Sequence, residues 1–337
     1  MPKQIIIEIL SFLKIFPNKK RVGIINLPNF QNVGCILVKF ALFKKLDKYG
    51  FNATIISPRT IEEHGDLSFM ERTIKSHFIE VDDEFTELKE RDFDYLIVNS
   101  DQTWGFYKSK YFYNVALLKF AKDWNTHKFI YGASMGRYYW YFKKSDKKLF
   151  KSLLKNFTGI SFREIGTIEL VKKYIHLESK FVLDPTLLLD KKYYLNAIKF
   201  YKSHLNLKEK YIFVYQLDKN QILEETIKES SKKLNFKFYK LNISKNDYIE
   251  DFLFRISKSQ AVITDSFHGT IFSIIFNKPF ISFSNKDRGQ ARFDSLKKIF
   301  NLENRILEPE NYSNININLL LKPLNINKTI FNKLKKI

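Results

Sequence analysis

The stretch SQAVITDSFHGTIFSIIFNKPFISF, residues 259–283, decides the fold of this chain. It contains two short apolar runs, 261–264 and 280–283, that are each bounded by turn residues. Such runs are typical of strands buried on both faces of a parallel sheet. The segment between them begins as a polar turn and continues as an apolar helix from near His268. The stretch therefore predicts a strand-turn-helix-strand unit of an α/β fold.

The turn of this unit, at 265–269, is the first candidate site. It lies at the carboxyl edge of the predicted sheet, where open α/β sheets bind ligands, and the helix amino terminus offers free N–H groups there. Ser266 or Asp265 is the predicted N-cap. Gly269 permits close backbone approach to a ligand, and His268 can titrate near neutral pH. A structural alternative stays open, in which His268 is only a polar residue of the first helical turn.

The rest of the chain alternates short strands with helical patterns in two halves, which predicts parallel sheets covered by helices. The predicted strands are 22–25, 53–57, 95–98, 129–131, 159–162, 180–183, 211–215, 236–240, 261–264 and 280–283. The predicted organisation is an amphipathic helix at 1–20, a first Rossmann-like domain at 21–190, a basic linker at 191–210, a second such domain at 211–310, and a tail at 311–337 with a final helix at 328–336.

The formal net charge is +21 over 337 residues. A charge of this sign favours binding to nucleic acid, to an acidic membrane surface or to small anionic ligands. Lysines are spread along the chain without a nucleic-acid module, so no nucleic-acid partner is predicted, and biased genome composition is an alternative source of the charge. The single Cys35 excludes a disulfide framework and indicates a reducing, cytoplasmic compartment. The six histidines lack zinc-site spacing, so no metal is predicted.

Residues 1–20 combine an apolar pattern with charged residues and a stop at Pro17. The segment is too short and too charged to span a bilayer, and it lacks a signal-peptide cleavage site. The pattern predicts an amphipathic helix. This helix either docks on the body of the protein or lies on an acidic membrane surface, at the inner face of the cytoplasmic membrane. The basic cluster Lys19, Lys20 and Arg21 adjoins it.

Seven short blocks follow one another along the chain: NVGCIL at 32–37, NSDQTW at 99–104, ASMG at 133–136, FRE at 162–164, LDPT at 183–186, TDSFHGT at 264–270 and LENR at 302–305. Together they resemble the polysaccharide pyruvyl transferase family, with departures at Val33, Cys35, Val38 and Asn99. The resemblance implies a GT-B-like fold, two Rossmann-like domains facing a central cleft.

The same resemblance implies a reaction. The enolpyruvyl group of phosphoenolpyruvate moves onto a hexose of a bacterial surface polysaccharide or its lipid-linked precursor, closing a 4,6-ketal. Phosphoenolpyruvate is then a co-substrate, and no cofactor is expected. Its carboxylate and phosphate suit the bidentate guanidinium fork. The predicted donor-binding residues, in the cleft, are Arg163, His268, Gly269, Arg288 and Arg292.

Ketal formation needs a general acid for the vinyl carbon and a base for the sugar hydroxyl. His268 is the predicted acid, or it holds the departing phosphate. Asp101, Asp184 and Asp265 are candidate bases, of which Asp101 and Asp265 are assigned to catalysis, although each also fits a helix cap or a turn. Predicted acceptor-binding residues are Asn32, Ser100, Asp101, Gln102 and Asp184. Arg163 has an alternative role, pairing with Glu164 or another acidic neighbour.

Two other functions fit some of these features. A GT-B glycosyltransferase would share the architecture and would bind the diphosphate of a nucleotide sugar at the same loops. A noncatalytic module would bind anionic polysaccharide or nucleic acid through its basic surface, with steep salt dependence. The product released from the donor distinguishes them, because only the pyruvyl transfer releases inorganic phosphate from phosphoenolpyruvate.

Overall fold

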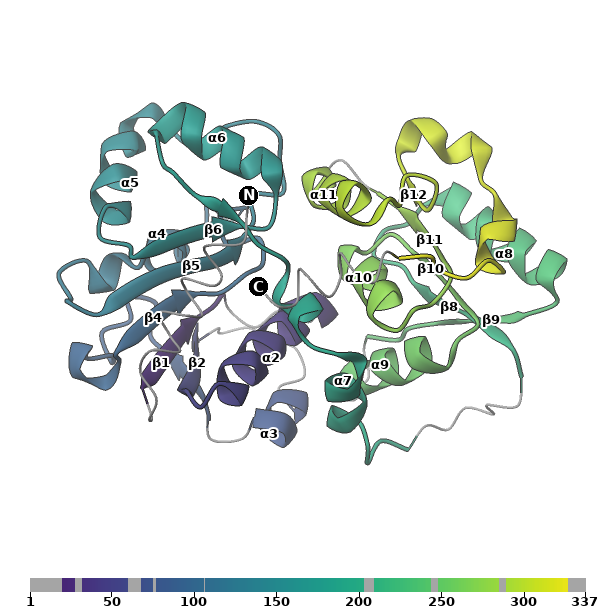
Figure 1. Cartoon of the computed structure of the whole chain (residues 1–337), viewed down its shortest axis with the longest axis horizontal. Coiled ribbons are helices and arrows are strands. Elements are labelled where there is room, and N and C mark those ends of the chain that lie inside the picture. Colours follow the sequence, from purple (N-terminus) through teal and green to yellow (C-terminus); the bar gives the residue numbers. More distant parts are fainter. Residues whose placement is uncertain are drawn as a thin grey trace. The chain divides into compact units, whose positions relative to one another are not determined.

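The structure of this chain is a computed structural model that describes residues 20–27, 32–59, 68–74, 77–105, 107–202, 209–243, 248–284 and 289–326. The chain divides into two compact units, with the boundary between Leu188 and Leu189. Each unit is built on one parallel sheet, with seven strands in the first unit and five in the second (Figure 1). The predicted α/β class with two Rossmann-like halves is confirmed.

The sheet of the first unit has the order β3-β2-β1-β4-β5-β6-β7. The order reverses between β1 and β4, which is the switch point beyond which α/β sheets place ligands. β1 and β4 are buried along almost their whole length, as expected of central strands. The strands span β1 Arg21–Ile25, β2 Asn52–Pro58, β3 Phe78–Val81, β4 Tyr95–Val98, β5 His127–Ala133, β6 Gly159–Phe162 and β7 Lys180–Phe181.

Helices cover both faces of this sheet. In Figure 1, α2 and α3 lie on one face and α5 and α6 on the other. The helix α5 shows why, since Phe150, Leu153 and Leu154 form one buried stripe while its three lysines are exposed. The helices span α2 Val33–Lys48, α3 Ser68–Ile74, α4 Phe112–Leu117, α5 Lys147–Leu154 and α6 Ile165–Ile175.

The sheet of the second unit has the order β12-β11-β10-β8-β9. The stretch 259–283 forms its centre, because β10 is fully buried and pairs in parallel with both β8 and β11. The strand-turn-helix-strand unit is therefore present as predicted. The elements span β8 Tyr211–Tyr215, α8 Gln221–Leu234, β9 Lys237–Lys240, α9 Tyr248–Lys258, β10 Ala261–Thr264, α10 Phe267–Ile275, β11 Phe280–Phe283, α11 Gln290–Phe300 and β12 Ile306–Leu307.

The segment 191–210, expected to act as a linker, contains the helix α7, Lys191–Ala197. Its Tyr194 is fully buried, and the ring meets Phe272 of α10 edge-to-face with centroids 4.9 Å apart. The start of this segment therefore packs as part of the second unit, because an aromatic side chain of this size stabilises a helix docked on the core.

Arg305, the last residue of the LENR block, ties the following chain to the second sheet. Its guanidinium donates to the carbonyl oxygens of Phe280, Leu319, Lys322 and Pro323 at 3.0–3.3 Å. Burial lowers the pKa of this guanidinium, but the carbonyls satisfy its donors. Part of the predicted tail is thus fixed to the unit, and the block has a structural role.

Two described strands escaped prediction. β3 has the sequence FIEV with only Val81 buried, and β12 has only two residues, so neither has both the length and the burial of the predicted central strands. The predicted helices at 1–20 and 328–336 lie outside the described residues, apart from Lys20. Within the described ranges, no helix is both long enough and apolar enough to cross a membrane.

Candidate active site

Predicted site residues of the first unit meet at the carboxyl edge of its sheet. Arg163 follows β6, and its guanidinium donates to Asp184, beyond β7, and to Oδ1 of Asp101, beyond β4, at 3.3 Å. The side chains of Arg163 and Asp184 are 1% and 2% exposed, and that of Asp101 is 22% exposed. Arg163 therefore pairs with acidic neighbours, but Glu164 is not one of them.

The environment of Asp184 is that of a structural anchor. Its Oδ1 accepts hydrogen bonds from the backbone N–H and the hydroxyl of Thr186, at 3.0 and 2.6 Å, while Oδ2 faces Arg163. A buried carboxylate with all these partners is strongly held. Asp184 thus fixes the guanidinium of Arg163 and has little surface to offer a substrate.

Asp101 is the more accessible of the two carboxylates. Its backbone has a φ of 110°, a conformation uncommon for a residue with a side chain, and such outliers cluster at functional sites. Its Oδ1 accepts from the backbone N–H of Gln102 at 2.8 Å and from Arg163. Since Oδ2 accepts no hydrogen bond from the described residues, one oxygen remains for a ligand hydroxyl.

Glu164 organises the loop that follows β5. Its carboxylate is fully buried and accepts from the Ser134 hydroxyl, from the Gly136 backbone N–H at 3.0 Å and from the Thr167 hydroxyl at 2.6 Å. Gly136 has a φ of 70°, which glycine adopts without strain. This carboxylate therefore holds the β5 loop against the start of α6.

The ends of β1 and β4 are joined by two asparagines. Asn99 donates to the side-chain oxygen of Asn26 at 2.6 Å, and its own oxygen accepts the Ser100 N–H at 2.8 Å. The Ser100 hydroxyl donates to the Gly132 carbonyl at 2.7 Å, so it holds β4 to β5. Asn26 was not singled out from the sequence, although a polar residue directly after a buried strand is a usable signal.

Asn32 caps α2. Its Oδ1 accepts the backbone N–H groups of Gly34 and Cys35 at 2.8 and 3.3 Å. The side-chain amide nitrogen of Asn32, not its oxygen, is thus the group left for the predicted acceptor role.

In the second unit, His268 lies in the first turn of α10 and is only 5% exposed. Ser266 is the N-cap, as predicted, and its hydroxyl accepts the Gly269 N–H at 3.3 Å. The ring of the preceding residue, Phe267, lies edge-on to His268 with centroids 5.3 Å apart. The guanidinium carbon of Arg292, from α11, lies 4.8 Å from the same Phe267 ring. Phe267 therefore connects the predicted histidine and arginine.

Gly269 is required by packing inside the unit. A Cβ at this position would lie 2.3 Å from the hydroxyl oxygen and 3.0 Å from the Cβ of Thr264, the last residue of β10. Thr264 is itself fixed, because its hydroxyl donates to the Tyr215 carbonyl at 2.6 Å. The glycine thus lets α10 approach β10 closely, and this packing role stands beside the ligand role predicted for it.

The carboxylate of Asp265 accepts hydrogen bonds from the backbone of the turn that follows β8. Its two oxygens accept the N–H groups of Leu217 and Asp218, after β8, at 2.7 and 2.9 Å. Burial raises the pKa of the Asp265 carboxyl above its usual range. With both oxygens engaged, Asp265 holds the turn after β8, and Asp101 is the better placed of the two carboxylates predicted to act in catalysis.

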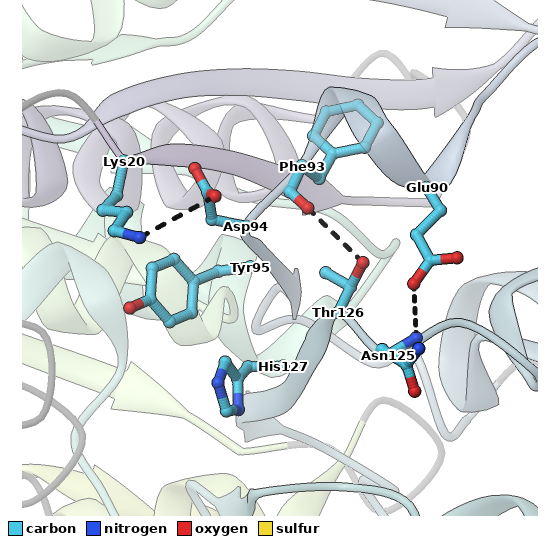
Figure 2. A pocket seen from close by; sticks show the side chains of 8 residues that line it. All are labelled: Lys20, Glu90, Phe93, Asp94, Tyr95, Asn125, Thr126 and His127. Atoms are coloured by element: carbon cyan, nitrogen blue, oxygen red, sulfur yellow. Dashed lines mark hydrogen bonds and ion pairs between the residues drawn. The ribbon is translucent and has the colours of Figure 1, made fainter.

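Arg288 lies outside the described residues, so its predicted role stays a prediction. The parts of the chain that the structure describes contain no cluster of three metal-ligating side chains. A cavity of about 360 Å³ lies at the other edge of the first sheet, by the first residues of β4 and β5, Tyr95 and His127 (Figure 2). It is therefore distinct from the site at the carboxyl ends.

Solved structures resemble this chain over most of its length. A protein assigned as a UDP-N-acetylglucosamine 2-epimerase from Listeria monocytogenes is 12% identical with a TM-score of 0.54, covering 94% of this chain and 91% of that chain. S. aureus MnaA in complex with UDP has the same four values. A functionally uncharacterised protein from Klebsiella pneumoniae is 13% identical with a TM-score of 0.52, covering 91% and 98%. At such identities the likeness shows the GT-B fold alone.

No curated protein sequence matches the chain at a significant level. The family model described as polysaccharide pyruvyl transferase matches residues 32–287. This range contains the residues gathered at the carboxyl edge of the first sheet, Asp101, Arg163 and Asp184, as well as His268 in the second unit. It also covers more than half of the chain, and the chain therefore belongs to the polysaccharide pyruvyl transferase family.

Proposed function

We propose that this protein transfers the pyruvyl group of phosphoenolpyruvate onto two hydroxyls of one hexose, as a 4,6-ketal, in a bacterial surface polysaccharide or its lipid-linked precursor. Family membership supports the reaction class. The observation that carries the site assignment is the placement of Asp101, which is held by the buried Arg163 and keeps one carboxylate oxygen for a ligand.

Asp101 is the proposed base for the attacking sugar hydroxyl. A carboxylate oxygen can accept the proton of a hydroxyl that lies within hydrogen-bond distance. Gln102 follows it directly and offers a side-chain amide to the sugar. Hydroxyl recognition by a carboxylate and an amide is common in sugar sites because both groups form directional hydrogen bonds.

His268 is the proposed acid. It gives its proton to C3 of phosphoenolpyruvate as the first hydroxyl bonds to C2. The C2–O bond to phosphate then breaks, and the second hydroxyl adds to C2. Its proton leaves with the inorganic phosphate, so the overall reaction consumes no reductant, oxidant or metal.

Arg292 is the proposed binder of the anionic donor, together with the amino terminus of α10. Arginine matches carboxylate and phosphate with two parallel hydrogen bonds. Its position over Phe267 places a guanidinium beside the residue next to His268. Arg163 is less suited than Arg292 to bind phosphoenolpyruvate, because two carboxylates already accept hydrogen bonds from its guanidinium.

The test is the release of inorganic phosphate from phosphoenolpyruvate by the purified protein, with and without a hexose acceptor. Acceptor-dependent release, together with a product heavier by one pyruvyl ketal in mass spectrometry, is the expected result. Release of UDP from a UDP-sugar, with no phosphate from phosphoenolpyruvate, would replace this proposal with the nucleotide-sugar glycosyltransferase alternative.

A further inference from the structure

Residues 137–155, RYYWYFKKSDKKLFKSLLK, contain seven basic residues and one acidic residue. The whole chain has 57 lysines and arginines among 337 residues, so the basic density here is about twice the average. General composition therefore does not account for this cluster. We call the surface formed by residues 137–155 the α5 surface.

The lysines of the α5 surface are all solvent-exposed: Lys143, Lys144, Lys147, Lys148, Lys151 and Lys155. None of them forms an ion pair with an acidic residue of the described ranges. The one acidic side chain of the segment, Asp146, is half-buried and accepts a hydrogen bond from the Tyr107 hydroxyl. The positive charge of this helix face is therefore not neutralised locally.

Large apolar and aromatic side chains accompany the lysines. Tyr138 and Tyr139 are 53% and 57% exposed, and Leu149 is 36% exposed. Arg137 fixes the aromatic loop, because it donates to the Tyr139 hydroxyl at 2.6 Å and lies 5.2 Å from the ring of Tyr141. The exposed ring of Tyr139 is thus held in place on the surface.

Two ring contacts join this loop to the helices of the unit. Phe142 meets Phe150 of α5 with centroids 5.0 Å apart, and Trp140 stacks on Tyr174 of α6 at 5.1 Å. The loop starts beside Gly136, which Glu164 holds at the carboxyl edge of the sheet. The α5 surface therefore adjoins the candidate active site of the first unit.

We propose that the α5 surface binds the headgroup phosphates of an acidic lipid bilayer. Lysines near such a surface each contribute to attraction, and tyrosine and tryptophan favour the level of the headgroups. The segment is less suited to bind nucleic acid. It contains no Asn or Gln that could read base edges, and its one arginine donates a hydrogen bond to Tyr139. The proposal concerns lipid binding without substrates, so it stands independently of the donor.

The experiment is co-sedimentation of the whole protein with vesicles, without substrate, at low salt and again at high salt. Neutral vesicles of phosphatidylcholine are compared with vesicles containing about one third phosphatidylglycerol. We expect partitioning onto the acidic vesicles only. The triple variant K147Q/K148Q/K151Q should lower the partition coefficient by about 100-fold, from three lysines near the surface. The variant Y138S/Y139S should remove the part of the binding that persists at high salt.

The matched control is K228Q/K232Q/K233Q on α8. These three lysines are also exposed, but Glu224, Glu225 and Glu229 stand among them on the same helix. The control should leave vesicle binding unchanged, and circular dichroism should show all variants folded. Absence of binding to acidic vesicles, equal loss in the α8 control, or tighter binding to duplex DNA than to vesicles would each overturn the proposal.

Discussion

Arg163 and Asp184 form an ion pair in which both side chains are almost completely removed from water. Burying two charges is costly, and removing one partner leaves the other uncompensated. The pair lies beyond the ends of β6 and β7, and through Arg163 it also fixes Asp101. The rigid part of the site is thus an arginine between two carboxylates, one structural and one accessible.

Asp184→Asn should destabilise the first unit by about 3–5 kcal/mol, because Arg163 loses its buried counter-charge. Tryptophan fluorescence during urea unfolding measures this unit selectively, since Trp104, Trp124 and Trp140 all lie in it. The control is Glu178→Gln, which breaks the exposed pair with Lys172 and should cost less than about 1 kcal/mol. Equal effects of the two changes would contradict the anchor role.

Asp101→Asn should lower turnover by about 10² to 10⁴ while the protein stays folded, because asparagine keeps the shape but cannot take the hydroxyl proton. Asparagine also tolerates a positive φ better than most residues. Phosphate release measures the effect, and Asp123→Asn, at an exposed acidic residue, serves as the control. Normal turnover of the Asp101 variant would remove this residue from catalysis.

His268→Gln should retain donor binding and lose turnover by a similar factor, because glutamine forms hydrogen bonds but carries no titratable proton. Donor affinity is measured by calorimetry with phosphoenolpyruvate, and turnover by phosphate release. His127→Gln, at the amino end of β5, is the matched control. If both activities survive in the His268 variant, the histidine is only a residue of the first helical turn.

Asp265→Asn tests the raised pKa of this buried carboxyl. An aspartic acid in the unfolded chain has a pKa of about 3.9, and in the native state Asp265 keeps its proton to higher pH. The free energy of unfolding of the wild type therefore falls as the pH rises above that value. The variant lacks this component, so the difference between wild type and variant should shrink or reverse as the pH rises above that value. Urea unfolding followed by circular dichroism at several pH values measures it, and a difference that grows with pH would refute the assignment.

Gly269→Ala should destabilise the second unit, since the new methyl group would overlap Thr264. Gly166→Ala is the matched control in another helix, because its Cβ would first meet the Tyr138 ring at 3.5 Å, an ordinary contact. Alanine there should be neutral or should stabilise α6 by up to about 1 kcal/mol. Thermal unfolding distinguishes the two, and a neutral Gly269 variant would show that α10 can move away from β10.

The fold was largely predictable because the central strands carry their own signal. β10 and β11 are short, apolar and bounded by turns, and the structure has them at the predicted residues. β3 escaped prediction although three of its four residues are apolar, because it is a short edge strand with only Val81 buried. Edge strands are specified by their neighbour in the sheet, which a local pattern does not contain.

The candidate site residues could be named from the sequence, but their contacts could not, and their roles stay predictions. Asp101 and Asp184 stand 62 and 21 positions from Arg163, so only the sheet order brings them together. The sequence left Asp101 and Asp265 equivalent, and they differ in exposure and in the groups that engage their oxygens. That difference depends on tertiary geometry, as does the burial of His268.

The Glu164 carboxylate is a common support for the two ligand sites proposed in the first unit. It fixes Ser134 and Gly136 to α6, so the β5 loop, the neighbouring Arg163 and the start of the α5 surface form one ordered body. A displacement of one part of this body would therefore displace the others. If a bilayer on the α5 surface changes the affinity of the site beside Asp101 for a sugar, linkage requires that the sugar changes the affinity for the bilayer by the same factor. An acceptor carried on a lipid would gain from both.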